Sequence, residues 1–263
     1  MRIQSVKLFS LFIILLSAAG CSEEKEQFET ESIAAYSMPL QVGKYFIYRV
    51  DSLVFPNFGR NTEIHKYQRK EVVEAIYTDN EGRPTYRINR YIRDSVNAQS
   101  WTAAQPWMAN GNYSVTLIDD QLEVIEHNLR FIKLHMPLKE GFGWSGNAFL
   151  PDDPYTSLFG TFGNDDNMDK WEYYYDEFEP TFTYRNKTYA DVWTVEQEDF
   201  SSNIPVIDVS GYGTKSRAFE KYAKGLGLVY REWELWEYQP NTTGTGGPYK
   251  QGFGVTQWLI DHN

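Results

Sequence analysis

The segment EVVEAIYTDNEGRPTYRINRYIRDS, residues Glu71–Ser95, indicates the fold most directly. Thr78-Asp79-Asn80-Glu81-Gly82 separates two runs that are rich in β-branched and aromatic side chains. Asp, Asn and Gly tolerate the backbone angles of tight turns, so this composition is typical of a β-hairpin. The sequence therefore predicts antiparallel strands over Glu71–Tyr77 and Arg83–Ser95.

The side chains of this hairpin alternate in character. Successive residues of a strand point to opposite faces of a sheet, so residues two apart share a face. The apolar set that we expect on one face is Val73, Ala75, Tyr77, Tyr86, Ile88 and Ile92. The polar set of the second strand is Arg83, Thr85, Arg87, Asn89 and Arg93. This pattern predicts one buried face and one solvated face.

The same strand character continues along most of the chain. Phe, Tyr and Trp number 16, 19 and 8, and aromatic residues favour pleated, half-buried surfaces. Further strands are predicted over Lys44–Phe55, Tyr113–Ile118, Asn128–Leu138, Lys170–Phe178, Phe182–Arg185, Thr188–Glu198, Ser216–Lys224, Leu226–Gln239 and Tyr249–Asp261. We expect a mainly β, antiparallel single domain with few short helices. It is either a strongly curved sheet (half-barrel) or a two-sheet sandwich.

The first 20 residues have the layout of a secretory signal peptide. Arg2 and Lys7 precede the apolar run Leu8–Leu16, and small residues follow it. A membrane-spanning helix needs about 20 apolar residues, which is longer than this run. Ala18-Ala19-Gly20-Cys21 resembles the bacterial lipobox, which implies cleavage before Cys21 and acylation of its thiol. The alternative is an ordinary signal peptide followed by a free cysteine.

Residues 21–37 are predicted to be an acidic tether, and residues 38–263 the β-rich globular domain. The tether holds several glutamates and few residues that could be buried, which is typical of a solvated linker. Cys21-Ser22-Glu23-Glu24 resembles the acidic export signal of Bacteroidota lipoproteins. That resemblance implies a lipid-anchored protein exposed at the surface of the outer membrane, with an inward-facing position as the alternative.

The charge of the chain excludes one class of partner. Removal of residues 1–20 takes Arg2 and Lys7, which leaves 23 of the 25 basic residues against 36 acidic ones. Phosphate backbones attract proteins of the opposite sign, so nucleic acid is not an expected partner. An anionic lipid surface is not expected to attract the domain either, which leaves the lipid on Cys21 as the membrane contact.

Two phrases carry a resemblance to a family. Pro137–Gly146 reads PLxxGxxWxG and Tyr222–Glu232 reads YAKGLGLVYRE. With the lipobox, they resemble uncharacterised outer-membrane lipoproteins of the Bacteroidota. The glycine–leucine–glycine turn is also similar, more faintly, to the curved half-barrels of lipoprotein carriers. The resemblance implies a location and a β fold, and it supplies no catalytic residues.

No catalytic motif stands out in the sequence. It lacks the Gly-x-Ser-x-Gly elbow and the His-Glu-x-x-His pair, and its four histidines are scattered. A carboxylate pair for glycoside hydrolysis stays open as an alternative, because the distance between two carboxylates decides such a site. The acids concerned are Glu172, Asp176, Glu177, Glu179, Glu232 and Glu234. We expect a protein that is not an enzyme and that has no cofactor besides the lipid.

One acidic segment has the spacing of a calcium loop. Asp165, Asn167 and Asp169 offer oxygen atoms at alternate positions, and Asp176 is twelfth counting from Asp165. However, Lys170 occupies the position that needs glycine, and Asp176 replaces the usual glutamate. A solvated acidic loop is therefore favoured over a calcium site.

Aromatic and acidic residues are mixed at two places. Trp171 and Tyr173 lie in one cluster, and Trp233 and Trp236 lie in another. Aromatic rings beside carboxylates suit sugar binding, which makes these four the candidate ligand-binding residues. The competing interpretation is cross-strand aromatic packing, which stabilises a sheet by itself and which the aromatic content favours.

These observations support three hypotheses of function. The leading one is a non-catalytic cell-envelope lipoprotein that acts as a binding or scaffolding module of an outer-membrane assembly. The second is a surface glycan-binding lipoprotein beside an uptake system. The third is a lipid binder similar to lipoprotein carriers, which requires an apolar cavity.

Overall fold

A computed structural model describes residues 31–95, 106–156 and 163–263. Its strands are β1 (Tyr45–Val54), β2 (Glu63–Thr78), β3 (Pro84–Asp94), β4 (Met108–Ile118), β5 (Gln121–Glu126), β6 (Leu129–His135), β7 (Gly143–Trp144), β8 (Tyr173–Tyr184), β9 (Lys187–Ser202), β10 (Gly213–Ala223), β11 (Gly227–Gln239) and β12 (Tyr249–His262). Three short 3-10 helices accompany them within these ranges: η1 (Ile33–Ala35), η2 (Gly163–Asp165) and η3 (Met168–Lys170). None of the helices in the described part of the chain is long and apolar enough to cross a bilayer. The predicted mainly β class is confirmed.

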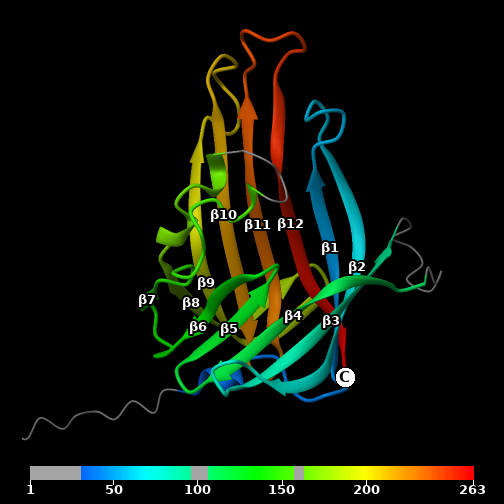
Figure 1. The fold of residues 1–263 in the computed structure, drawn as a ribbon, viewed down its shortest axis with the longest axis vertical. Helices are drawn as coiled ribbons and strands as arrows, with labels where there is room; N and C mark the ends of the chain where they lie inside the picture. The colour runs from blue at the N-terminus through cyan, green and yellow to red at the C-terminus, as the bar shows by residue number, and fades with distance from the viewer. Residues whose placement is uncertain (1–30, 96–105, 157–162) are drawn as a thin grey trace, which may run out of the picture. The chain divides into compact units, whose positions relative to one another are not determined.

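All the strands belong to one antiparallel sheet. Its order is β6-β5-β4-β3-β2-β1-β12-β11-β10-β9-β8-β7, and Figure 1 shows how strongly it curves. The backbone N–H of Ile132 in β6 donates to the carbonyl of Gly146, just after β7, over 2.8 Å. The indole of Trp144 donates to the carbonyl of Ile132 over 2.9 Å. The two edges of the sheet therefore meet, which gives a nearly closed, barrel-like sheet rather than a sandwich.

The predicted hairpin is formed by β2 and β3. Val73 pairs with Ile88, and both side chains are fully buried. The register shifts between Val73 and Ala75, so Tyr77 does not follow Val73 onto the buried face and its ring is exposed. A β-bulge places one extra residue in a strand and so reverses the alternation beyond it. The prediction that Tyr77 shares the buried face of Val73 is therefore wrong.

The two family-like phrases correspond to places where the backbone approaches a neighbour closely. Gly146 lies against the ring of Tyr173, and a Cβ atom there would lie 2.3 Å from the Cδ2 atom of that ring. Gly227 has a φ of +79°, and its Cβ would lie 2.4 Å from the backbone nitrogen of Met38. Only glycine satisfies both requirements at position 227, because other residues are strained at positive φ.

The globular unit begins at Glu31. Ile33 and Tyr36 are buried in the core, and the hydroxyl of Tyr36 donates to the carboxylate of Glu31 over 2.8 Å. Lys224, at the turn after β10, pairs with the same carboxylate. Residues 31–37 thus pack as part of the domain, although the sequence assigns them to the tether. The apolar side chains of Ile33 and Tyr36 explain this difference.

Candidate functional site

A cavity of about 180 Å³ lies inside the curved sheet. Its apolar wall is built from Val124, Leu129, Phe131, Tyr155, Trp233, Phe253 and Val255. Its polar lining consists of Arg69, Glu126, His127, Lys133 and Arg231. A second, smaller space shares Val124, Glu126, Lys133 and Arg231 with it, and continues toward Glu71 and Arg90. The inner face of the sheet therefore encloses a site that is apolar on one side and charged on the other.

Tyr155 covers one side of the cavity, from the long segment between β7 and β8. Its ring contacts Trp233 and Phe253 edge to face, with centroids 5.7 and 5.8 Å apart. Its backbone N–H donates to the Oδ2 atom of Asp165 over 2.8 Å. The amide of Asn164 donates to the carbonyls of Lys215 and Trp236, at 2.9 and 2.6 Å. Asn164 is therefore fixed to β10 and β11, and the neighbouring Asp165 holds the backbone of Tyr155.

One charged group of the inner face is centred on Arg90. Its Nε atom lies 3.4 Å from Oε1 of Glu71, and its Nη1 atom donates to the carboxylate of Glu126. The hydroxyl of Tyr113 donates to Oε2 of Glu71 over 2.7 Å. Burial opposes the ionised form of Glu126, but Arg90 outweighs it and lowers the pKa of this carboxyl to about 2. Glu126 is therefore held as a carboxylate by the guanidinium that also contacts Glu71.

A second charged group is centred on Glu220. Its Oε1 atom accepts from Nζ of Lys133 at 3.1 Å and from Nε of Arg231 at 2.7 Å. Its Oε2 atom accepts from the hydroxyl of Tyr222 at 2.6 Å. Burial again opposes ionisation, and the two cations still lower the pKa of Glu220 to about 2. Lys133 belongs to β6 and Glu220 to β10, so this group joins strands that are far apart in the sheet order.

Arg69 differs from the other cations of the inner face. Its Nη1 atom donates to Oε1 of Gln257 over 2.8 Å, but no carboxylate of the described residues pairs with it. Its Nε atom is buried without a hydrogen-bond partner. Burial, together with the nearby charge of Arg90, lowers the pKa of Arg69 to about 10. The side chain is still charged at neutral pH, and Glu71 and Glu126 attract it without forming an ion pair with it among the described residues.

The lining combines charged, aromatic and aliphatic side chains. None of the residues that line the cavity is a serine, threonine or cysteine. The charged side chains stand beside aromatic and aliphatic ones, which is the usual composition of a site for a small organic ligand. His127 is exposed and lies at the rim.

The four aromatic residues predicted to bind a ligand do not form an exposed platform. Trp171, Tyr173 and Trp236 are only 9, 1 and 7% exposed. Their rings pack in the core or between strands, as cross-strand aromatic packing predicts. Only Trp233 reaches the cavity, where it stacks edge to face on Phe253 at 5.3 Å.

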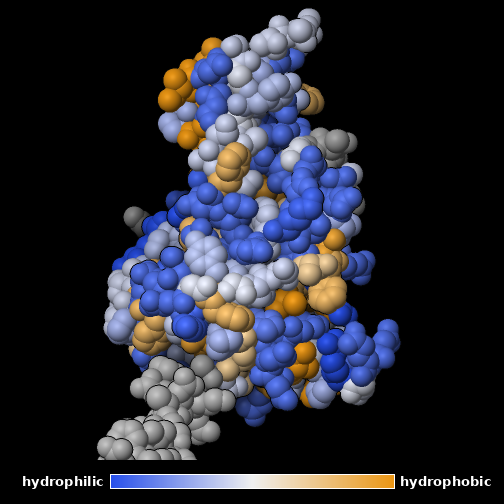
Figure 2. Space-filling model, turned by 90° about the vertical axis from the view of Figure 1, so that its left-hand side faces the viewer, coloured by the Kyte–Doolittle hydropathy of each residue, from blue (hydrophilic) through white to orange (hydrophobic). Residues whose placement is uncertain are grey.

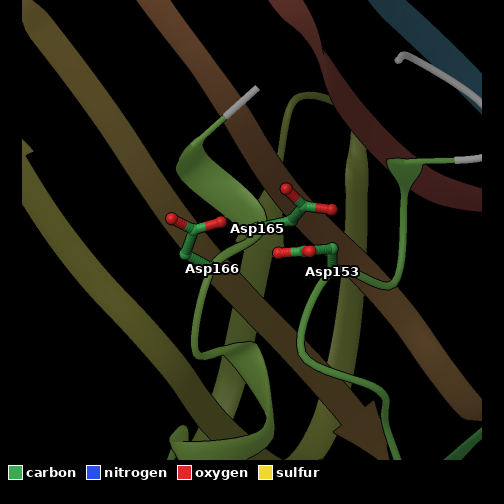
Figure 3. Close-up of side chains that lie close together, drawn as sticks. All are labelled: Asp153, Asp165 and Asp166. Carbon is green, nitrogen blue, oxygen red and sulfur yellow. The ribbon is translucent and has the colours of Figure 1, made fainter. Parts of the chain in front are cut away.

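The predicted calcium loop does not form in the described structure. Residues 163–165 and 168–170 are 3-10 turns, and Asp176 is an exposed residue of strand β8. Asp176 is the fourth residue of this strand, which begins at Tyr173, and it does not belong to the group of carboxylates around Asp165. Of the predicted ligands, Asp165 instead lies beside Asp153 and Asp166, and Figure 3 shows these three carboxylates close together. Asn167 contacts Lys170, and one carboxylate oxygen of Asp169 is buried without a partner.

The sequence interpretation missed the charged residues of the cavity, although a signal for them exists. Glu71 is two residues from Val73, and Arg90 is two residues from Ile88, so both lie on the predicted buried face. Glu220 stands in the same relation to Ala218 and Tyr222. Charged residues at buried positions of a strand indicate a polar network or a ligand. Cys21, the predicted lipidation site, lies outside the described residues.

Comparisons with known proteins do not identify a family for this chain. No family model matches the chain, and no curated protein matches it. The chain is similar to a protein from Bacteroides fragilis that is provisionally described as an exported protein with a YmcC-like fold. The identity is 12% and the TM-score is 0.39, over 87% of this chain and 99% of that one. A provisionally described lipoprotein from Parabacteroides distasonis gives 10% and 0.40 over the same shares. A provisionally described outer-membrane lipoprotein-sorting domain from Vibrio parahaemolyticus gives 9% and 0.18 over 88% of each chain. Likeness of this size carries no conclusion about function.

Proposed function

We propose that this chain is a non-catalytic lipoprotein of the cell envelope, anchored in the outer membrane through Cys21, which binds a small amphiphilic ligand inside its curved sheet. The observation that carries the proposal is the cavity lined by Tyr155, Trp233 and Phe253, with its apolar wall and charged lining. An engineered cavity of about 150 Å³ takes up benzene, so a space of this size accommodates a ring or a short alkyl chain. Of the three hypotheses from the sequence, this one is closest to the lipid binder.

The proposal is tested by ligand binding to a form without the anchor. Cys21→Ala should leave the mature chain soluble, and octanoate can then be titrated by calorimetry. Val255→Trp places a large ring in the cavity wall and should abolish binding while the protein stays folded. Val209→Trp is the matched control, because Val209 is exposed in the loop between β9 and β10. Equal binding by both variants, or no binding by any of them, would contradict the proposal.

A second candidate function, docking of a partner protein, is favoured by the loop between β9 and β10. Ile207, Val209 and Tyr212 are 87, 70 and 69% exposed. Figure 2 shows hydrophobic side chains gathered at the end of the domain that carries this loop. The side chain of Asn203 fixes the loop, since its amide donates to the carbonyl of Asp208 at 2.8 Å and its oxygen accepts from the backbone of Ile207 at 3.0 Å. A pre-ordered apolar loop loses little entropy on binding.

Affinity isolation of the lipidated protein from membranes tests this second candidate. A specific partner should be recovered with the native chain and lost with the double variant Ile207→Ser and Val209→Ser, whose cavity is intact. Octanoate binding should not change in that variant. Recovery of the same proteins by both forms would show that the loop is not a docking surface.

A further inference from the structure

We infer that the cavity holds an anionic group of its ligand, a carboxylate or a phosphate, against Arg69 and Arg231. The inference rests on the proposed ligand-binding function and names the chemical class of the ligand. It comes from three features of the inner face: its charge balance, its unpaired hydrogen-bond donors and the position of its apolar wall.

The charges of the inner face are not balanced. Its cations are Arg69, Arg90, Lys133 and Arg231, and its carboxylates are Glu71, Glu126 and Glu220. Four positive charges therefore face three negative ones. A buried charge is costly unless it is paired. One further negative charge would neutralise the site.

The unpaired polar atoms of the site are all hydrogen-bond donors. They are Nε of Arg69, Nε1 of Trp233 and Nε2 of Gln257, each buried without a partner. Arg69 and Trp233 line the same cavity, and Gln257 lines the connected space and accepts a hydrogen bond from Arg69. Nearly all buried polar groups in native proteins find a partner, so this cluster of unpaired donors suits a ligand that supplies acceptors. An anionic oxygen provides both the acceptor and the charge.

The carboxylates of the site do not meet this need, because other cations already hold them. Glu71 and Glu126 bind Arg90, and Glu220 binds Lys133 and Arg231. Among the described residues, the side-chain hydrogen bond of Arg69 goes to the neutral oxygen of Gln257, and Glu71 and Glu126 attract it without pairing with it. Nη1 of Arg69 donates to Gln257, whereas its Nε atom has no hydrogen-bond partner. The planar guanidinium can therefore still donate to a carboxylate or a phosphate.

The apolar wall of the cavity indicates where the apolar part of the ligand lies. Leu129, Phe131 and Phe253 line the same cavity as Arg69 and Arg231. A ligand whose anionic head lies at Arg69 therefore extends its apolar part over these side chains. This geometry favours a short amphiphile with one acidic head over a sugar or a neutral apolar molecule.

The test compares probes that share a chain and differ in charge. Octanoate, octyl phosphate and octanol are titrated into the soluble Cys21→Ala protein at one ionic strength. We expect at least one of the two anions to bind at least tenfold more tightly than octanol, and the tighter anion distinguishes carboxylate from phosphate. In Arg69→Gln this preference should disappear, with octanol affinity unchanged within twofold. Arg217→Gln, on the outer face, is the matched control and should keep the preference.

Thermal unfolding of the ligand-free proteins gives a second readout. If Arg69 serves the ligand, Arg69→Gln should unfold at the same temperature as the parent or at a higher one, since it removes an unpaired buried charge. A clear loss of stability with unchanged anion preference would assign Arg69 a structural role and overturn the inference. Equal binding of octanol and both anions would overturn the inference but leave the proposed function standing. Failure of all three probes to bind would count against the proposed function itself.

Discussion

Strands β10 and β11 carry two ion pairs of the same geometry on opposite faces of the sheet. On the inner face, Nε of Arg231 lies 2.7 Å from Oε1 of Glu220. On the outer face, Nε of Arg217 also lies 2.7 Å from Oε1 of Glu232. The side chain of Glu220 is 2% exposed, whereas that of Glu232 is 25% exposed. The two pairs therefore differ mainly in their access to water.

The difference shows what holds the inner charges in place. Water screens the outer pair, so removing one partner leaves a solvated ion that costs little. The inner pair is shielded from water. The carboxylate of Glu220 compensates for the lost hydration by accepting hydrogen bonds from Lys133, Arg231 and Tyr222. Buried ion pairs add little net stability over an apolar core of the same volume. The net stability of the sheet alone therefore does not account for these charges, which the proposed ligand site would use.

The largest effect should come from breaking the inner pair. Glu220→Gln keeps the shape and one acceptor oxygen but leaves Lys133 and Arg231 without their carboxylate. Loss of one partner from a buried pair costs about 3–5 kcal/mol. We expect a fall of this size in the free energy of unfolding, measured by urea denaturation of the Cys21→Ala protein.

The matched control is Glu232→Gln, which makes the same change in the outer pair of the same two strands. It should lower the free energy of unfolding by no more than about 1 kcal/mol. If both substitutions cost the same, the contrast between the two faces would be wrong.

A second effect should appear in acid. The pKa values of Glu126 and Glu220 are each lowered to about 2 in the folded protein, against about 4.3 in an unfolded chain. The folded state binds fewer protons in this range, so stability is complete above pH 4.5 and falls as the pH drops toward 2. The loss should be on the order of 3 kcal/mol per carboxylate when both pKa values have been passed.

Urea denaturation at several pH values between 7 and 3 measures this loss. In Glu220→Gln one of the two carboxylates is gone, so the decline with falling pH should be shallower than in the parent. A parent protein whose stability is constant or rises over this range would show that the inner carboxylates are not held in their ionised form.

The comparison of the two faces also explains how much of the structure can be predicted from the sequence alone. The alternation of Ala218, Glu220 and Tyr222 in one strand, and of Arg231 and Trp233 in the next, is visible without a structure. It predicts correctly that these residues lie on strands. It cannot show that Glu220 meets Lys133, because the two are 87 residues apart and are brought together by the curvature of the sheet.

More of the fold than of the site can be predicted from the sequence, because the fold depends more on local patterns. Turn residues and alternation are local, so the hairpin of β2 and β3 and most other strands follow from the sequence. Strand β5 is short and the sequence pattern does not predict it, and the contact of Ile132 with Gly146 depends on the whole order of the sheet. The cavity depends on that closure, so its lining from Arg69 to Phe253 could not be assembled from local patterns.

The smallest effect should be the coupling within the outer pair itself. In a double-mutant cycle of Arg217→Gln and Glu232→Gln, we expect a coupling energy of about 0.2–1 kcal/mol, as for other partly exposed pairs. Asp199 also pairs with Arg217 and takes over part of the charge when Glu232 is removed, which keeps the value low. Because water reaches this pair, the coupling should shrink when urea denaturation is repeated in 1 M salt, where the screening length is about 3 Å. A coupling above about 2 kcal/mol that salt leaves unchanged would mean that the outer face is effectively buried. A further surface would then have to cover β10 and β11 there.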